Sequence, residues 1–105
     1  MRQRSISAPF YGPVAEAEAE AVGKQSALER EVIEMFEQFR DRILRYLLAM
    51  GLGVQDGEEV VQEVFLALFQ HLRMGKSRRN LRAWVFRVAH NLGLKQRCRN
   101  HRERS

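Results

Sequence analysis

Apolar residues recur at steps of three and four from residue 27 onward, a spacing that is typical of amphipathic helices. We predict a first helix over about 27–50, because its apolar positions fall on one face. These positions are Leu28, Val32, Phe36, Phe39, Ile43, Tyr46, Leu47 and Met50. Ser26 and Glu29 have the spacing of an N-terminal capping box. Gly51 stands where a left-handed C-terminal cap is expected.

Two further segments show the same period. We predict a second helix over about 57–73, with Asp56 as its N-cap and Glu59 three residues on. Its apolar positions are Val60, Val61, Val64, Phe65, Leu68, Phe69 and Leu72. A third helix begins near Leu81, with Asn80 as its N-cap. Its inner face carries Leu81, Val85, Val88 and Leu92, flanked by Trp84 and Ala89, which we also expect in the core.

The first 25 residues lack this apolar pattern. Pro9 and Pro13 interrupt regular structure, and the run AEAEAEA over residues 15–21 favours a helix without providing an apolar stripe. A short helix with nothing to pack against is marginal in water. We therefore predict that this extension is flexible or weakly helical.

Three amphipathic helices joined by short loops predict an all-α fold, a compact three-helix bundle with one shared core. We divide the chain into an extension at 1–25, a helical domain at 26–101 and a basic tail at 102–105, and we expect disorder in the tail. Gly93 lowers helix propensity by about 1 kcal/mol relative to alanine, so we expect the third helix to bend or fray there.

Charge is distributed unevenly along the chain. Residues 26–72 have four arginines and nine acidic residues, whereas residues 73–105 have eleven Lys or Arg and only one acidic residue, Glu103. An acidic middle and a basic end indicate two binding surfaces, with the basic one facing a polyanion. The alternative is that both are simply solvated faces.

Several classes of function find no support in the sequence. Cys98 is the only cysteine, which excludes a disulfide framework, and His71, His90 and His101 lack the spacing of metal ligands. There is no nucleophile paired with a base and no phosphate-binding glycine loop, so we predict neither an enzyme nor a cofactor. No apolar run is long enough to span a membrane. We expect a cytoplasmic protein without a membrane partner.

The back of the third helix combines an aromatic residue with cations. Phe86 and His90 are neighbours at a four-residue step, and Arg82 and Arg97 lie on the same side. Cations that follow phosphates and flat groups that stack on bases are the usual equipment for binding single-stranded nucleic acid. Asn91, at the border of this face, could pair with a base edge. Alternatively, Phe86 packs against the extension and Asn91 caps a local backbone group.

The back of the second helix is acidic. Glu59, Gln62 and Glu63 are three and four residues apart, so they form one patch, with Leu66 one turn on. A solvated face with negative charge near a helix N-terminus is the alternative interpretation.

Three stretches together resemble a known family. FEQFRDRILRYLLAMG, DGEEVVQEVFLALFQHL and NLRAWVFRVAHNLGLKQR resemble region 2 of bacterial sigma factors, and are most similar to the extracytoplasmic-function (ECF) group of the sigma-70 family. The resemblance covers about residues 29–100. It implies a helical domain that binds the coiled coil of the largest subunit of the RNA polymerase core. It also implies recognition of the promoter −10 element and retention of its melted non-template strand.

The resemblance assigns residues to both partners. Its polymerase-binding positions correspond to Glu59, Gln62 and Glu63, although the family has aspartate more often at the first of these. Its asparagine that contacts an extruded base corresponds to Asn91, and the loop Lys76–Asn80 would help to form the base pocket. The DNA-binding set implied in this way, together with the aromatic of the third helix, is Lys76, Arg78, Arg79, Asn80, Arg82, Phe86, Arg87, Asn91 and Lys95.

The sequence departs from the family in two respects. Lys95 and Gln96 stand where the family often has an acidic residue. The 105 residues also contain no region 4, the helix-turn-helix that reads the −35 element, so we expect either a piece of a longer factor or a natural protein without that half. Two alternatives remain open. One is a sigma-like module that binds polymerase or an anti-sigma factor without reading promoters, and the other is a nucleic-acid-binding bundle unrelated to transcription.

Overall fold

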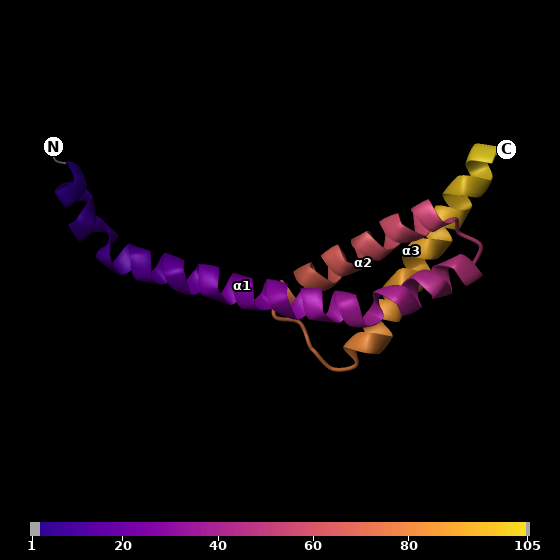
Figure 1. Cartoon of the computed structure of the whole chain (residues 1–105), viewed down its shortest axis with the longest axis horizontal. Coiled ribbons are helices and arrows are strands. Elements are labelled where there is room, and N and C mark those ends of the chain that lie inside the picture. Colours follow the sequence, from indigo (N-terminus) through magenta and orange to yellow (C-terminus); the bar gives the residue numbers. More distant parts are fainter. Residues whose placement is uncertain (1–2, 105) are drawn as a thin grey trace.

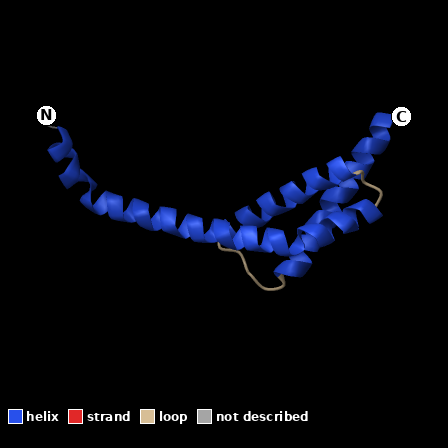
Figure 2. Cartoon of the chain, in the orientation of Figure 1, coloured by secondary structure: helices blue, strands red, loops and turns tan. Residues whose placement is uncertain are grey.

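The chain folds into three helices in a computed structural model that describes the backbone of residues 3–104 and the side chains of residues 16–104. The helices are α1 (Gln3–Ala49), α2 (Val54–Arg73) and α3 (Leu81–Arg104), and the described residues include no strand (Figure 2). The molecule measures 66 × 33 × 20 Å, because α1 protrudes far beyond the other two helices (Figure 1). The all-α prediction with three helices is confirmed.

The first helix is much longer than predicted. It does not begin at Ser26 but continues back to Gln3, so the capping box predicted for Ser26 and Glu29 is wrong. The alanines and glutamates of the extension propagate the helix without a cap, since both have high helix propensity. Its first turns, which include both prolines in the sequence, bend away from the rest of α1 (Figure 1). The extension is thus helical over residues 3–25, and residues 1–2 lie outside the described part.

Glycines with positive φ end the first two helices, as expected for Gly51. Gly51 has φ 106°, its N–H donates to the Leu48 carbonyl (3.0 Å), and the Leu52 N–H donates to the Leu47 carbonyl (3.2 Å). This pair of bonds is a Schellman motif, which satisfies carbonyls that the helix leaves unpaired. The same pattern ends α2 at Gly75, with φ 74°. Both turns reverse the chain within a few residues, so the three helices pack side by side.

The starts of α2 and α3 differ from the predicted caps. Gly53 occupies the N-cap of α2 and forms no side-chain capping bond. Asp56 lies in the first turn instead, where its carboxylate accepts a hydrogen bond from Asn100 of α3 (2.9 Å). Asn80 stands at the start of α3 with φ 55°, a conformation that asparagine tolerates better than most residues. Its backbone carbonyl accepts the Trp84 N–H (3.0 Å), but its side chain does not cap the helix.

The core lies where all three helices meet, and it contains most of the predicted apolar positions. Phe36 and Phe65 pack edge to face across α1 and α2, with ring centroids 4.8 Å apart. Burying a side chain the size of leucine or phenylalanine contributes about 1.5–3 kcal/mol. The buried apolar residues are Val32, Phe39, Ile43, Leu47, Leu52, Val60, Val61, Val64, Phe65, Leu68, Leu72, Val85 and Ala89.

The third helix neither frays at Gly93 nor ends before the basic tail. Gly93 is buried, and a Cβ atom there would lie 2.8 Å from Leu47 Cδ2 and 3.1 Å from Met50. The absence of a side chain thus allows α3 to approach α1 closely, and this packing offsets the low propensity of glycine. The helix continues to Arg104, so disorder predicted for the tail is wrong over residues 102–104, and Ser105 lies outside the described residues.

Candidate binding surfaces

The outward side of α2 presents the predicted acidic patch. Glu59, Gln62 and Glu63 are exposed, and none of them forms an ion pair or hydrogen bond with another described side chain. Leu66, one turn on, is 64% exposed. These four residues are called the α2 face below. Since their polar groups are not used within the fold, they are available to a partner.

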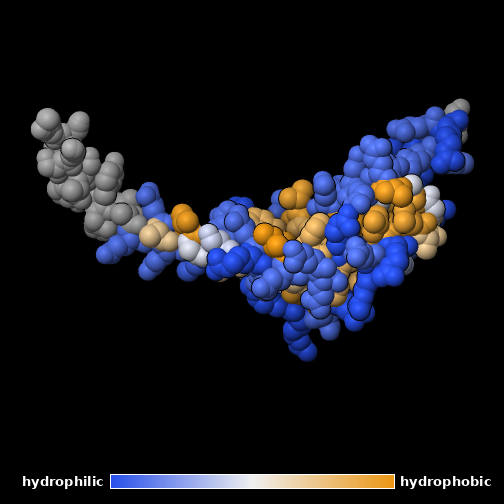
Figure 3. Space-filling model, in the orientation of Figure 1, coloured by the Kyte–Doolittle hydropathy of each residue, from blue (hydrophilic) through white to orange (hydrophobic). Residues whose placement is uncertain are grey.

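An apolar groove of about 540 Å³ borders the α2 face where α1 and α2 meet. Its walls include Ile33, which is 55% exposed, together with Phe36 of α1 and Leu66 of α2. Gln62 lies at its edge. Hydrophobic residues reach the surface along this border (Figure 3). An exposed apolar strip rimmed by polar groups is typical of a protein-binding site. Sequence periodicity gave no sign of Ile33, which lies outside the apolar stripe of α1.

Glu58 differs from its acidic neighbours on α2. Its two carboxylate oxygens accept hydrogen bonds from Arg40 Nη2 of α1, at 2.5 and 2.6 Å. Both side chains are about one third exposed, so this pair is worth at most about 1 kcal/mol. Glu58 therefore joins α2 to α1, whereas Glu59 and Glu63 face solvent.

A basic surface runs over the loop between α2 and α3 and along the outward side of α3. The members below are exposed and form no ion pair with a described residue. They are Lys76, Arg79, Arg82, Arg87, Asn91 and Lys95, which are called the α3 face below. Asn91 makes no hydrogen bond to a nearby backbone group within the described residues, so its amide is available to a ligand. Asn80 is also exposed, beside Arg79.

Phe86 is less outward than predicted. Its ring is half-buried and packs edge to face on Tyr46 of α1, with centroids 6.1 Å apart. It therefore contacts the packed part of α1 rather than the extension. The Tyr46 hydroxyl also lies 2.6 Å from His90 Nδ1. Tyr46 was predicted as an inner residue, yet it is 37% exposed and forms an aromatic edge with Phe86 and His90 beside the α3 face.

The loop between α2 and α3 is tied to the helices on both sides. Arg78, one of the predicted DNA-binding residues, forms an ion pair with Glu31 of α1. His71 Nε2 of α2 lies 3.0 Å from the Ser77 carbonyl oxygen. The His71 ring also stacks on the half-buried Trp84 of α3, with centroids 4.3 Å apart. The sequence gave no sign of the roles of Glu31 and His71.

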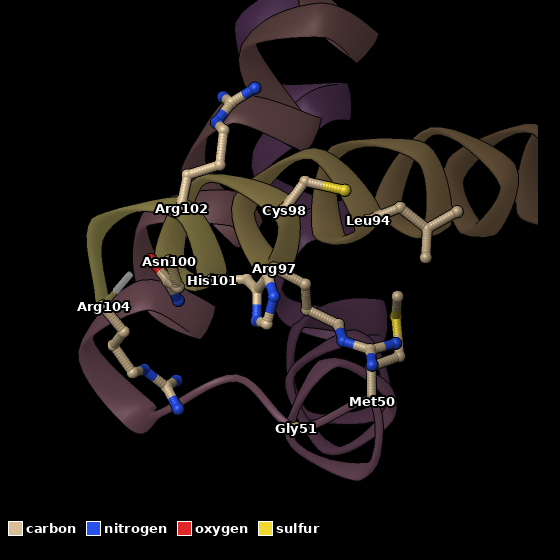
Figure 4. Close-up of a pocket in the computed structure, with 9 residues that line it drawn as sticks. All are labelled: Met50, Gly51, Leu94, Arg97, Cys98, Asn100, His101, Arg102 and Arg104. Atoms are coloured by element: carbon tan, nitrogen blue, oxygen red, sulfur yellow. The ribbon is translucent and has the colours of Figure 1, made fainter.

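The C-terminal half of α3 extends the positive charge. A hollow of about 680 Å³ opens between this half and the turn after α1. Met50 and Leu94 are among its apolar lining residues, while Arg97 reaches across it toward Met50 (Figure 4). Arg102 and Arg104 also line it, and the C-terminal end of α3 is hydrophilic (Figure 3). Positive charge thus continues past Asn91 to the end of the helix.

Two other kinds of feature are absent from the part of the chain that the structure describes. No group of three or more His, Cys, Asp or Glu side chains there could hold a metal ion. No helix there is long and apolar enough to cross a membrane.

The domain, with its three-helix core and two charged surfaces, can be assigned to a known family by comparison. The family model described as Sigma-70 region 2 matches residues 35–103, about two thirds of the chain. The chain therefore belongs to the sigma-70 region 2 family, whose domains bind the RNA polymerase core and recognise the −10 element in transcription initiation. The matched range covers both faces but omits most of the protruding part of α1. The search of curated proteins and the search of solved structures each found no match.

Proposed function

We propose that this chain acts as the promoter-recognition domain of a sigma factor of the extracytoplasmic-function group. The α2 face docks on the RNA polymerase core, and the α3 face holds the melted non-template strand of the −10 element. The observation that carries the proposal is the separation of charge. Acidic and amide groups without partners gather on α2, and cations with a free amide gather on α3, so the two kinds of group lie on different helices of one core.

The α2 face suits the coiled coil of the largest polymerase subunit. A helical partner could lay apolar side chains in the groove beside Ile33 and Leu66, while its cations meet Glu59 and Glu63. Apolar contact at the centre and charge at the rim would give affinity and orientation together. An anti-sigma factor that used the same face would compete with polymerase.

The α3 face suits an unstacked strand. The Asn91 amide has both donor and acceptor, so it could hydrogen-bond to a base edge once that base has left the stack. Arg82 and Arg87 of the same helix are exposed and form no ion pair with a described acidic group, which favours contact with phosphates. The aromatic edge of Tyr46 and Phe86 lies beside this path and offers a surface for stacking.

The experiment that tests this proposal compares single-stranded with duplex DNA. A decamer is selected from a randomised pool with the polymerase-bound protein, and is then presented as a single strand and as a duplex in fluorescence anisotropy at several salt concentrations. We expect preference for the single strand and a log–log salt slope of roughly −2, as for about three phosphate contacts. Equal or tighter binding to the duplex would overturn the proposal.

A further inference from the structure

We propose that His71 is a positioning residue, which fixes the loop of residues 74–80 against α3 and thereby sets which base this loop and Asn91 accept. The inference rests on the proposed function, because it concerns base selection at the α3 face. His71 lies in the last turn of α2, and we expect it to touch neither the base nor the phosphates. It would act through the loop.

His71 holds two successive loop residues. Its backbone carbonyl accepts the Lys76 N–H (3.2 Å), as part of the turn that ends α2. Its ring Nε2 lies 3.0 Å from the carbonyl oxygen of Ser77. A carbonyl oxygen only accepts, so Nε2 carries the proton and donates it. The backbone of His71 thus holds the loop at Lys76, and its side chain holds the loop one residue further, at Ser77.

The same ring also connects the loop to α3. It stacks on Trp84 with centroids 4.3 Å apart and an interplanar angle of 36°. Trp84 is in the first turn of α3, and its N–H donates to the Asn80 carbonyl at the far end of the loop. His71 therefore links the start of the loop to the helix that carries Asn91.

Little else holds the loop in place. All of residues 74–80 are exposed, so apolar burial does not restrain them. The other side-chain ties are the ion pair of Arg78 with Glu31 and the hydrogen bond from the Arg79 N–H to Ser77 Oγ (3.1 Å). An exposed loop held by so few polar contacts opens readily when one of them is lost.

Loosening the loop should affect base choice more than affinity. A base pocket discriminates only while its walls keep their position, whereas exposed cations attract phosphates from many loop positions. Lys76 and Arg79 keep their charge whatever the loop conformation. Loss of the His71 tie should therefore lower the preference among bases and leave the salt slope unchanged.

Two variants of His71 separate its contacts. His71→Phe keeps a flat ring beside Trp84 but has no donor for Ser77. His71→Gln keeps an N–H donor of similar reach and loses the aromatic ring. Gln70→Ala, at the exposed neighbouring position, is the matched control. If circular dichroism shows that His71→Phe does not fold, His71→Met replaces it. Met and Gln are unbranched and similar in length, so these two variants differ mainly in the hydrogen-bond donor.

The first measurement does not involve DNA. Trypsin cuts after Lys76, Arg78 and Arg79, and the rate at these sites under native conditions reports how often the loop opens. We expect His71→Phe to be cut about fivefold faster than the wild type, the factor that corresponds to a hydrogen bond of about 1 kcal/mol. His71→Gln should be cut at a rate between those of His71→Phe and the wild type, because it keeps the donor for Ser77 and loses the ring that stacks on Trp84. Gln70→Ala should stay close to the wild-type rate. If trypsin cuts His71→Phe at the wild-type rate, the inference is overturned, whatever the DNA measurements show.

The second measurement uses oligothymidylate strands with one central base varied, in anisotropy. We expect the ratio of affinities between the best and worst base to fall about fivefold in His71→Phe, at an unchanged salt slope, and to recover in part in His71→Gln. A loosened loop with undiminished base preference would also overturn the inference. No base preference in the wild type would instead contradict the proposed function, and with it the role in base selection, while the trypsin result would still report whether His71 holds the loop.

Discussion

The outward sides of α2 and α3 differ although both helices bury their other sides in the same core. Before Arg73, α2 contains no Lys or Arg, and before Glu103, α3 contains no Asp or Glu. The buried positions of both helices are apolar, with valine, leucine and phenylalanine in α2 and valine and alanine in α3, and they belong to one core. The apolar pattern therefore specifies the fold, while the charge of the unburied positions distinguishes the two surfaces and is expected to select their partners.

The two faces also differ in how they are supported. The α2 face lies wholly on one helix, next to a groove lined by packed phenylalanines. The α3 face includes an exposed loop that depends on a few polar ties, such as that between His71 and Ser77. A change on the α2 face should therefore act locally. A substitution beneath the loop, at a residue outside the α3 face, should still alter binding at the α3 face, because the loop would lose its position.

The largest effect on both faces is expected from a substitution in the core that they share. Leu47→Ala truncates a fully buried side chain next to Gly93 and should cost about 2–5 kcal/mol in the free energy of unfolding. Urea unfolding followed by circular dichroism measures it, with the exposed Val22→Ala as control. Binding at both faces should fall together. A change below about 0.5 kcal/mol would contradict the packing described here.

A charge reversal should disable the α2 face alone. Glu63→Lys places a cation where the partner is expected to bring its own, so affinity for the polymerase coiled coil should drop on the order of a hundredfold. Isothermal titration with the coiled-coil fragment measures it. Glu34→Lys makes the same charge change at an exposed position of α1 outside both faces. Equal losses in the two variants would show a general effect of charge instead.

Removal of one amide should flatten base choice at the α3 face. Asn91→Ala loses the donor and acceptor proposed to contact a base, and good contacts of this kind are worth about 1–3 kcal/mol of discrimination. The affinity ratio between best and worst base, measured by anisotropy, should fall roughly tenfold at that contact. The salt slope should not change, because no cation is removed. Undiminished base preference would refute the role of Asn91.

The smallest effect is expected for a single cation. Arg87→Ala should lower affinity a few-fold and make the salt slope shallower by about 0.7, the contribution of one phosphate contact on a single strand. The base preference should persist. Arg30→Ala, which removes an exposed arginine from α1, should leave the slope unchanged when measured in the same titration.

Local patterns predicted the interior of the fold well. Periodicity identified Ile43, Val64 and Val85 as core residues, and the left-handed cap at Gly51 was predicted from its place after the last apolar position. The start of α1 was not predicted, because a capping signal is weak against a long run of strong helix formers. The role of Gly93 was missed because propensity describes one helix by itself, whereas its benefit is the approach of α3 to α1.

The surfaces were predictable only where a single helix defines them. Glu59 and Glu63 lie outward as expected, since their spacing relative to the core residues fixes their direction. Contacts between distant segments could not be predicted in this way. The pair of Arg78 with Glu31 and the packing of Phe86 on α1 depend on how the helices meet in space.

The most direct test of the separation between the faces is one crossed binding experiment. The wild type, Glu63→Lys and Asn91→Ala are each titrated with the polymerase coiled coil and with single strands that differ in one base. We predict that Glu63→Lys loses the coiled coil and keeps the wild-type ratio of affinities between bases. Asn91→Ala should keep the coiled coil and lose that ratio. Either variant impaired in both assays, with its helicity intact, would contradict the account.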